Sequence, residues 1–531
     1  MSFTQKFINH NLYHLKGNKK KSNKIFLVEF NGWPAIHIIF SYLINFFKNE
    51  KGCKIVAYEC YHLLNRLEPA WYSKYLWKLG IFLNIKTFKI FKSFGTDQFI
   101  KPTYAKNYDH EADRIIKNFY SKKPNLVKLE NFKLKKIWIG DLIYDSFLKK
   151  NYLVTIDINS NDFKIFFKKF IKLFLFWKNY FNTNKISGIG VCHSVYLTGI
   201  PLRIAQSKKI DCFAISGFNC DLVNLVNSIS YKNKTNGTDT HYKYYKKIFS
   251  KFPKKIKNEH LILGKKILDD FTSGRKRYFY MKNKTFSLSK SKKIKEKKSK
   301  TKVVIFAHDF VDSPHVYGNH FFTDFKSWFN FLDKIIKNTD YNWYVKVHPG
   351  ANEITKKEIL KLKKDNKKIK LLEKNFPNNH LVKIGVKFVL TVFGTIASEL
   401  PPYGIRVINA SKNTPHYDYN FSLNPKNLKE YKNLLINLNN VNGEFKFNDK
   451  ELFMYQFVKE LIFQNHLFFK DTERYFKFTD KRPLHLTPQL YKYWLEDFNL
   501  EVHNKIINDL REFIYSKNYL TLNQNINTFR T

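Results

Sequence analysis

The chain has 531 residues, 44% of them hydrophobic and 17% aromatic, which is material for two or three domains with real cores and excludes a disordered or fibrous chain. Its 93 Lys and Arg against 44 Asp and Glu give a net charge of +49, yet only ten of the basic residues are Arg. Because sequence-specific nucleic-acid binding depends on the two-pronged contacts of Arg, this diffuse Lys excess indicates a compositional bias, and we expect no nucleic-acid partner.

The cysteines and the apolar runs indicate a cellular compartment. Five cysteines, an odd number with no C-x-x-C pair, argue against a disulfide framework and against a cysteine-built metal site. Residues 1–23 are a basic extension without the apolar core of a signal peptide, and no apolar run approaches 18 residues. We therefore expect a cytoplasmic protein that associates peripherally with the inner membrane face through its lysines.

Residues 24–286 alternate short apolar runs with helical stretches, a pattern that predicts parallel strands joined by crossover helices. The expected strands cover residues 24–30, 54–58, 136–141, 186–192 and 212–215. We interpret this segment as a Rossmann-like domain that binds the acceptor. Gly188-x-Gly190 resembles the start of a dinucleotide fingerprint, but His193 stands where the last glycine belongs, so we do not expect NAD.

Three positions in this first domain are candidates for chemistry. Glu29, before the turn Asn31-Gly32, is a candidate base that would face a cleft between domains. Asp141 and Asp145 lie one helical turn apart, and either can hold an acceptor sugar or simply occupy a first helical turn, where carboxylates are favoured. His193 ends a strand and is a second candidate for acceptor binding.

A Lys-rich run at residues 287–302 is typical of an extended linker, because like charges repel. Residues 303–445 then restart the pattern as a second Rossmann-like domain, which we expect to bind the nucleotide donor. Its expected strands cover 302–307, 343–347, 369–372, 388–392 and 406–409, and its expected helices 324–338, a segment from 353, and 425–437. Residues 446–531 are predicted to be a helical C-terminal region.

Ligands of open α/β sheets bind outside the carboxyl ends of the strands, so we examined the residues that follow each strand. His308 and Asp309 follow the first strand and are candidate bases; Asp309 can also be an ordinary turn residue. His348-Pro349 ends the second strand, where the imidazole can donate to a phosphate or merely cap the strand. The fourth strand runs into a turn and an expected helix N-terminus suited to an anion, with the candidates Gly394, Thr395, Ser398 and Glu399.

This combination resembles the GT-B-type glycosyltransferases of bacterial surface polysaccharide synthesis. The closest resemblance is to capsule polysaccharide biosynthesis proteins, which are similar to capsule Kdo transferases, sialyl- and polysialyltransferases and CDP-glycerol glycerophosphotransferases. It rests on the strand ending in His348-Pro349, on the turn Gly394-Thr395-x-x-Ser398-Glu399, and on the segment 139–146. In that group, the equivalent motifs hold the phosphate and ribose of a cytidine nucleotide, which the resemblance implies for His348, Pro349 and the Gly394 turn.

The resemblance implies transfer of a sugar or polyol phosphate from a nucleotide-activated donor to a saccharide or lipid-linked acceptor. A displacement of this kind needs one base, for which we consider Asp309, His308 and Glu29 in that order. The chain has no D-x-D motif, so we expect no metal and no cofactor beyond the nucleotide-sugar co-substrate. The alternatives are a UDP-sugar 2-epimerase and a non-catalytic polysaccharide-assembly protein.

Overall fold

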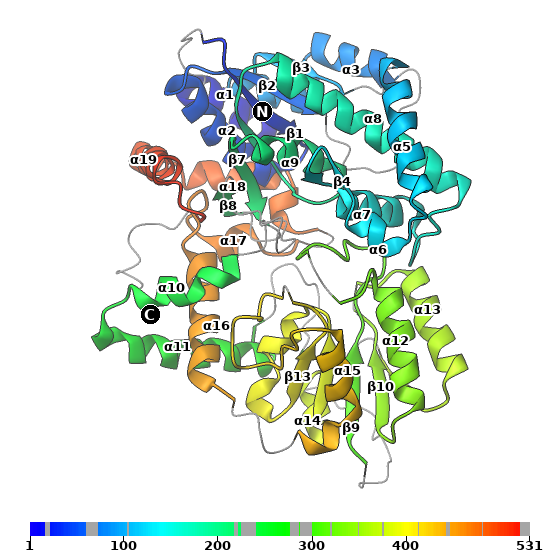
Figure 1. Cartoon of the computed structure of the whole chain (residues 1–531). Coiled ribbons are helices and arrows are strands. Elements are labelled where there is room, and N and C mark those ends of the chain that lie inside the picture. The colour runs from blue at the N-terminus through cyan, green and yellow to red at the C-terminus, as the bar shows by residue number, and fades with distance from the viewer. Residues whose placement is uncertain are drawn as a thin grey trace.

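The fold was analysed in a computed structural model. It describes residues 1–15, 22–59, 73–102, 106–216, 221–224, 241–276, 286, 300–318, 321–348, 350–373, 376–412, 414–441, 447–479 and 482–520. Most of the expected linker (287–299) and Pro349 lie outside the described residues. Two sheets divide the chain into an N-terminal unit and a C-terminal unit, each named here for its sheet and covering helices (Figure 1).

The N-terminal unit is built on a six-stranded sheet with the order β3-β2-β1-β6-β7-β8. All neighbours in it are parallel except β7 and β8. Its strands are β1 (Ile25–Phe30), β2 (Lys54–Glu59), β3 (Gln98–Ile100), β6 (Ile186–Val191), β7 (Asp211–Ser216) and β8 (Asp221–Asn224). The first five residues of β1 are buried because helices cover both faces of a parallel sheet, which explains the nearly continuous apolar run.

The C-terminal unit contains a five-stranded parallel sheet with the order β11-β10-β9-β12-β13. Its strands are β9 (Lys302–Phe306), β10 (Asn342–Lys346), β11 (Ile369–Leu372), β12 (Phe388–Thr391) and β13 (Arg406–Asn409). From β9 in the middle, β10 and β11 are added on one side of the sheet, and β12 and β13 are added on the other side. This doubly wound order confirms the predicted α/β class with two Rossmann-like units.

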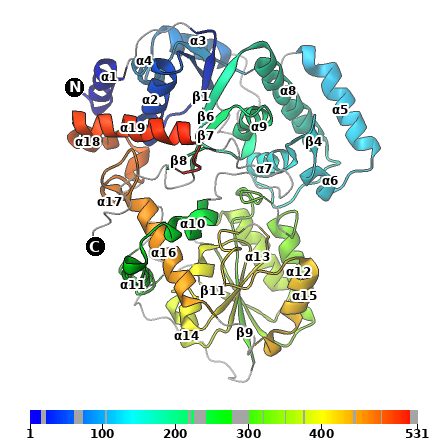
Figure 2. The same cartoon turned by 60° about the vertical axis from the view of Figure 1, so that its left-hand side comes forward.

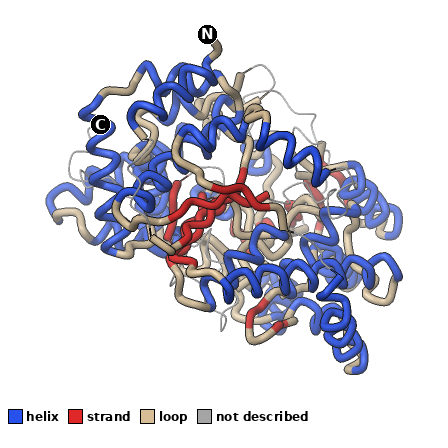
Figure 3. Tube along the Cα trace, turned by 90° about the horizontal axis from the view of Figure 1, so that it is seen from above, coloured by secondary structure: helices blue, strands red, loops and turns tan. Residues whose placement is uncertain are grey.

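Helices enclose the strands, as the view from above shows (Figure 3). Those between the strands of the first sheet are α2 (Pro34–Asn49), α3 (Ser73–Phe82), α4 (Thr87–Ser93), α5 (Asp109–Ser121), α6 (Leu126–Glu130), α7 (Gly140–Asn151), α8 (Asn161–Thr183) and α9 (Gly199–Ser207). Those of the second unit are α12 (Phe325–Lys337), α13 (Glu353–Asp365), α14 (Asn379–Lys383) and α15 (Leu428–Ile436). Helix α1 (Phe3–His14) precedes the first strand, and α10 (Tyr245–Ser250) and α11 (Lys254–Thr272) lie between the two sheets in sequence.

The C-terminal region is helical as predicted, with α16 (Asp449–Gln464), α17 (Thr472–Tyr475), α18 (Gln489–Glu496) and α19 (Leu500–Ser516). Helix α16 packs against α11 so closely that the backbone oxygen of Phe453 lies 2.0 Å from where a Cβ on Gly264 would stand. Helices α18 and α19 return to the N-terminal unit and share one core with α1 and α2 (Figure 2). The first sheet is therefore covered in part by the last helices of the chain.

Two sequence expectations about secondary structure are wrong. The expected strand at 136–141 is a two-residue ladder outside the main sheet, β4 (Lys133–Leu134) with β5 (Ile137–Trp138). Its turn residues, Lys135 and Lys136, both have positive φ, and α7 begins directly afterwards. The helix expected after Gly394 is a pair of short 3-10 turns, η5 (Thr395–Ser398) and η6 (Pro401–Tyr403). Because a proline has no N–H, the bonds that would extend an α-helix through 401 and 402 are unavailable.

Candidate functional site

Each sheet has a topological switch point, where the chain leaves two neighbouring parallel strands toward opposite edges of the sheet. In the C-terminal unit the switch lies between β9 and β12, and in the N-terminal unit between β1 and β6. Open α/β sheets bind ligands outside the carboxyl ends of the strands at such points. The residues that follow these four strands are therefore the first place to look for a site.

At the C-terminal switch point, His308 links the two diverging strands. Its Nε2 accepts a hydrogen bond from the backbone N–H of Val392 (3.2 Å) and lies 3.1 Å from Thr391 Oγ1. The ring stacks on Phe325 with centroids 4.8 Å apart. Burial lowers the pKa of His308 to about 3, with a smaller contribution from His348. His308 is therefore neutral near pH 7, and its basic nitrogen already accepts a backbone N–H, which suits a positioning residue better than a base.

The turn after β12 is held by the same threonine. Thr391 Oγ1 accepts from the backbone N–H of Gly394 at 3.0 Å. A Cβ on Gly394 would stand 2.7 Å from that oxygen, so this turn requires glycine. Thr395 is exposed and donates its hydroxyl to Glu399 at 2.8 Å. The expected helix N-terminus is replaced by the η5 turn, so an anion here would meet side chains and single amides rather than a helix dipole.

Ser398 and Glu399 are both buried. The Ser398 hydroxyl donates to the Thr395 carbonyl oxygen, and its own carbonyl accepts from Gln456 of α16. The Glu399 carboxylate raises the pKa of Lys346, but burial outweighs it and the pKa of Lys346 falls to about 8. Ser398 and Glu399 thus support the turn from behind, and Gly394 and Thr395 form its outer part.

His348 lies at the same sheet edge, two residues beyond β10, and its side chain is exposed. Its Nδ1 accepts from the backbone N–H of Gly350 at 3.0 Å, which in the neutral ring places the proton on Nε2. An exposed imidazole with Nε2 protonated can donate to a phosphate oxygen. Pro349, the second residue of the predicted His-Pro motif, lies outside the described residues.

Asp309 follows His308 at the end of β9 and is half-buried. Among the described residues, its carboxylate has one hydrogen bond, accepted from the hydroxyl of Thr355 in the first turn of α13 (2.8 Å). The same hydroxyl oxygen accepts from the backbone N–H of Phe310 (2.9 Å). This arrangement fixes the loop and leaves carboxylate acceptor capacity for a substrate hydroxyl, as a general base requires.

The loops that follow β6 and β9 meet, so the carboxyl ends of the two sheets face each other. Tyr196, five residues beyond β6, donates its hydroxyl to Asp312 of the β9 loop (2.8 Å), and Ser313 donates to the Tyr196 oxygen. Lys149 of α7 pairs with the same Asp312 at 2.9 Å. Burial opposes ionisation of Asp312, but Lys149, Tyr196 and His193 together lower its pKa. His193, a predicted acceptor residue, therefore lies at this junction.

At the N-terminal switch point, Glu29 is enclosed. Its carboxylate accepts from the backbone N–H of Cys192 (3.0 Å), from the Cys192 thiol (2.6 Å) and from the Asn31 amide (3.4 Å). The residue has no exposed surface. The expectation that Glu29 faces a cleft as a base is therefore wrong, because its carboxylate joins the ends of β1 and β6 inside the unit.

A buried polar chain extends this network to the C-terminal helices. His37 of α2 binds the Asn31 carbonyl oxygen through Nε2 (2.6 Å), and its Nδ1 lies 2.5 Å from the hydroxyl of Tyr491 in α18. Burial lowers the pKa of His37 to about 4, against the effect of the Asn31 carbonyl. The neutral ring therefore donates to Asn31 and accepts from Tyr491, which ties α18 to the turn after β1.

Asp141 forms a buried ion pair with Arg203 of α9. Two nearly parallel contacts join the guanidinium and the carboxylate, at 3.0 and 2.6 Å, and Arg203 also donates to the Trp138 carbonyl oxygen and stacks on its ring. Both partners are at most 2% exposed. The prediction that Asp141 binds an acceptor does not fit this geometry, because the carboxylate is buried and neutralises the Arg203 guanidinium.

Asp145 forms the second buried pair, and this one joins the two units. Its Oδ1 lies 2.5 Å from Nδ1 of His315, and its Oδ2 accepts from the His315 backbone N–H at 3.2 Å. Burial opposes the imidazolium, but the Asp145 carboxylate raises the pKa of His315 to about 9. Next to it, the Tyr144 hydroxyl donates to Asp324, the N-cap of α12, at 2.6 Å.

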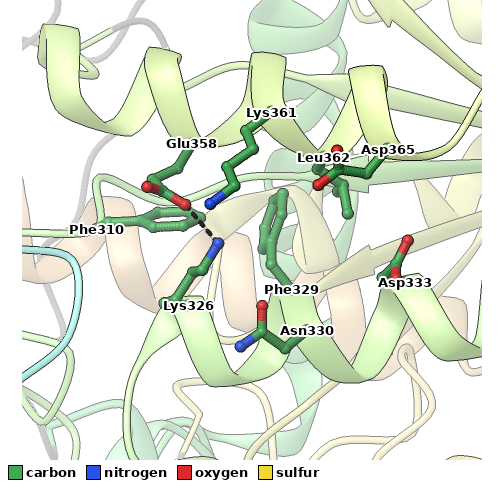
Figure 4. Close-up of a pocket in the computed structure, with 9 residues that line it drawn as sticks. All are labelled: Phe310, Lys326, Phe329, Asn330, Asp333, Glu358, Lys361, Leu362 and Asp365. Atoms are coloured by element: carbon green, nitrogen blue, oxygen red, sulfur yellow. Dashed lines mark hydrogen bonds and ion pairs between the residues drawn. The ribbon is translucent and has the colours of Figure 1, made fainter.

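A pocket elsewhere on the C-terminal unit lies between α12 and α13 and holds none of the predicted site residues (Figure 4). The ion pair between Lys326 and Glu358 crosses it. In the described part of the chain, no three His, Cys, Asp or Glu side chains gather as metal ligands, and no helix there is long and apolar enough to cross a bilayer.

Sequence reasoning missed several residues of this region. Thr391 belongs to a predicted strand, and no motif surrounds Arg203. The sequence offered one signal for the two ion pairs. Asp141 and Asp145 stand in a mainly apolar helical segment, where buried carboxylates need cationic partners. Nothing local identified which cations these are, since the partners lie 62 and 170 residues further along the chain.

No family model matches the chain, and no curated protein matches it in sequence. Among solved structures, it is similar to a UDP-GlcNAc 2-epimerase from Neisseria meningitidis bound to UDP-GlcNAc, with 12% identity, 82% of this chain and 98% of that chain covered, and a TM-score of 0.24. A putative UDP-N-acetylglucosamine 2-epimerase from Listeria monocytogenes is 11% identical, with 83% of this chain and 95% of that chain covered and a TM-score of 0.27. A glycosyltransferase from Rickettsia africae is 9% identical, with 93% of this chain and 99% of that chain covered and a TM-score of 0.24. Such low identities and TM-scores leave the function to be argued from this chain's own residues.

Proposed function

We propose that the protein is a glycosyltransferase of capsule or other surface polysaccharide biosynthesis. It would transfer a sugar or polyol phosphate from a nucleotide-activated donor, cytidine-linked by the resemblance of its motifs, to a saccharide or lipid-linked acceptor. One observation carries the proposal: the loops after β6 and β9 meet, so two doubly wound sheets direct their ligand-binding edges toward each other. A donor on one edge and an acceptor on the other would be brought together there.

The C-terminal unit is the proposed donor side. His348 presents an imidazole at the end of β10, and the glycine turn at Gly394 brings its backbone and the exposed Thr395 to the end of β12. Hydrogen-bond donors at such positions stabilise the phosphate that leaves. Neutral His308 sits between them and fixes the turn through Thr391 and Val392.

In the proposed step, an acceptor hydroxyl oxygen forms a bond to the anomeric carbon as the bond from that carbon to the phosphate oxygen breaks. The hydroxyl proton passes to the Asp309 carboxylate, and the electron pair of the broken bond leaves with the nucleotide phosphate, which His348 stabilises. A base placed in this way contributes about 10²–10⁴-fold to the rate. Of the three predicted bases, Asp309 is the one that combines a carboxylate with partial exposure of the residue at the carboxyl edge of the second sheet.

The test is a thermal-shift screen of the full chain with cytidine and uridine mono- and diphosphates and their activated sugars. A ligand at 100 times its Kd stabilises the folded protein by about 2.7 kcal/mol. We expect His348→Ala to abolish the shift and His110→Ala, which also replaces an exposed histidine, to retain it. If no nucleotide shifts the midpoint, the transferase proposal fails. Turnover of a UDP-sugar with no acceptor present would favour a 2-epimerase instead.

A further inference from the structure

Helix α3 turns an apolar face outward. Six large apolar side chains between residues 75 and 85 are exposed: Tyr75 64%, Leu76 57%, Leu79 47%, Phe82 83%, Leu83 53% and Ile85 41%. Residues 75, 79 and 82 follow the helical spacing of three and four, and 76 borders the same face. Leu83 and Ile85 lie in the turn that directly follows the helix, and we call the six side chains together the apolar stripe. A contiguous apolar stripe on the surface of a folded protein marks an interaction surface.

The opposite face of α3 is fixed against the unit, so the stripe cannot turn inward. Trp77 packs edge-on against Phe30 of β1 and Phe88 of α4, with ring centroids 5.1 and 4.9 Å away. Gly80 meets the same Phe88 ring, and a Cβ there would stand 2.5 Å from it. The helix is thus seated by one aromatic face, and the outward direction of the other face follows from that seating.

The charged side chains of the segment that carries the stripe have a single sign. From residue 73 to residue 96, all of them described, the chain carries no acidic residue and five lysines: Lys74, Lys78, Lys86, Lys89 and Lys92. All five are exposed. An apolar stripe bordered by lysines is complementary to a bilayer with anionic headgroups, where each Lys near the surface adds to the attraction.

We propose that α3 docks this protein on an anionic lipid bilayer, with the stripe in the acyl boundary and the lysines at the headgroup phosphates. A helix of ten residues is about 15 Å long, so it lies in the interface and does not cross it. A second copy of the same surface is a poorer occupant, because a two-fold contact would set the lysines of both copies against each other.

The position of α3 is compatible with this occupant. In both side views, α3 lies at the end of the N-terminal unit away from the C-terminal unit (Figures 1 and 2). Docking there leaves the C-terminal unit and its switch point clear of the bilayer. The inference goes beyond the proposed function and is tested without any substrate, so either can fail while the other stands.

The experiment measures flotation of the full chain with vesicles. The anionic vesicles contain phosphatidylglycerol and phosphatidylethanolamine, and the neutral vesicles contain phosphatidylcholine alone. We expect Leu79→Ser with Phe82→Ser to weaken binding to anionic vesicles at least about tenfold. Lys74→Gln with Lys78→Gln should weaken it about 30-fold, at about 1 kcal/mol per Lys, and raising the salt to 0.5 M should weaken the wild type because it screens the lysines.

The matched control is Ile262→Ser with Leu360→Ser, which removes two exposed apolar side chains from α11 and α13 (70% and 54% exposed). It should bind as the wild type does, and circular dichroism should show an unchanged unfolding midpoint for every variant. Failure of the wild type to float with anionic vesicles overturns the proposal. So does equal loss in the control pair, or a dimer in solution that the Leu79/Phe82 variant dissolves.

Discussion

The Asp145 carboxylate of the N-terminal unit and the His315 imidazole of the C-terminal unit form an ion pair with no more than 2% of either residue exposed. The pair is a buried ionic contact of the junction, whereas Lys149 and Asp312 meet at its partly exposed rim. A buried pair of this kind contributes little net stability over an apolar pair, but loss of one partner leaves an uncompensated charge. The contact between the two units therefore depends on the Asp145–His315 pair and on the protonation of His315.

The pH dependence of stability should report this pair. Because the pKa of His315 rises from about 6.5 to about 9 on folding, its contribution is complete below pH 6.5 and is lost as the pH rises through 9. The two values imply about 3 kcal/mol. Lys346 has the opposite effect, because its folded pKa is lowered to about 8 and stability rises with pH there. The informative quantity is thus the difference in unfolding free energy between wild type and Asp145→Asn.

We expect that difference to shrink between pH 7 and pH 9.5, as the wild type loses the pair that the variant already lacks. Urea unfolding at each pH measures it. A difference that stays constant over this range would show that His315 does not lose its proton between pH 7 and pH 9.5 in the folded protein.

Asp141→Asn should destabilise the N-terminal unit by about 3–5 kcal/mol, because it leaves the buried Arg203 guanidinium uncompensated. Asp113→Asn, which removes an exposed partner of Lys168, should change stability by less than about 1 kcal/mol. Urea unfolding compares them. Adding Arg203→Met to Asp141→Asn should recover part of the loss. A variant with full stability and weaker acceptor binding would instead restore Asp141 as an acceptor residue.

Gly394→Ala should distort the turn after β12. The new Cβ would press on Thr391 Oγ1, which holds both the Gly394 N–H and the His308 ring, and overpacking of this kind costs about 1–3 kcal/mol. We expect a lower unfolding midpoint and weaker nucleotide binding by titration calorimetry. Gly32→Ala is the control, since a Cβ there meets no atom within 4 Å. Unchanged nucleotide binding in Gly394→Ala would place the donor elsewhere.

Tyr491→Phe should loosen the C-terminal helices from the first unit. Without the hydroxyl, Nδ1 of the buried His37 loses its donor, at a cost of about 1–3 kcal/mol. Tyr493→Phe on the same helix removes a hydroxyl that accepts one long hydrogen bond from Gln489 and should be nearly neutral. Thermal unfolding followed by circular dichroism measures both. Equal midpoints for the two variants would mean that the His37 contact adds nothing.

The sheets were predictable because their strands are short apolar runs bounded by polar turns. The expected strand 302–307 is β9, and 406–409 is β13. The switch point was not predictable. The pairing of β9 with β12, in addition to its pairing with β10, is decided by the packing of the whole sheet. His308 and Thr391 therefore meet across 83 residues with no local signal.

The failures have equally physical reasons. Around residue 140, Lys135 and Lys136 adopt left-handed backbone and turn the chain into a miniature hairpin, a conformation that lysine seldom signals. For Glu29, position at a strand end indicated function, but its carboxylate is enclosed by the Cys192 thiol, directly after β6, and by the Asn31 amide in the turn after β1. A strand-end carboxylate is thus equally suited to closing a sheet edge.

The core that α1 and α2 share with α18 and α19 constrains the order in which the protein can mature. Phe7 stacks on Tyr491, and these two rings are separated by most of the chain. At translation rates of about 5–20 residues per second, a ribosome needs roughly 25–100 s to make the intervening segment. During that time the part of α2 that packs on α18 and α19 has no native cover, and the second sheet can be complete before the first. The unit synthesised first therefore cannot complete its core until the last helices of the chain have been made.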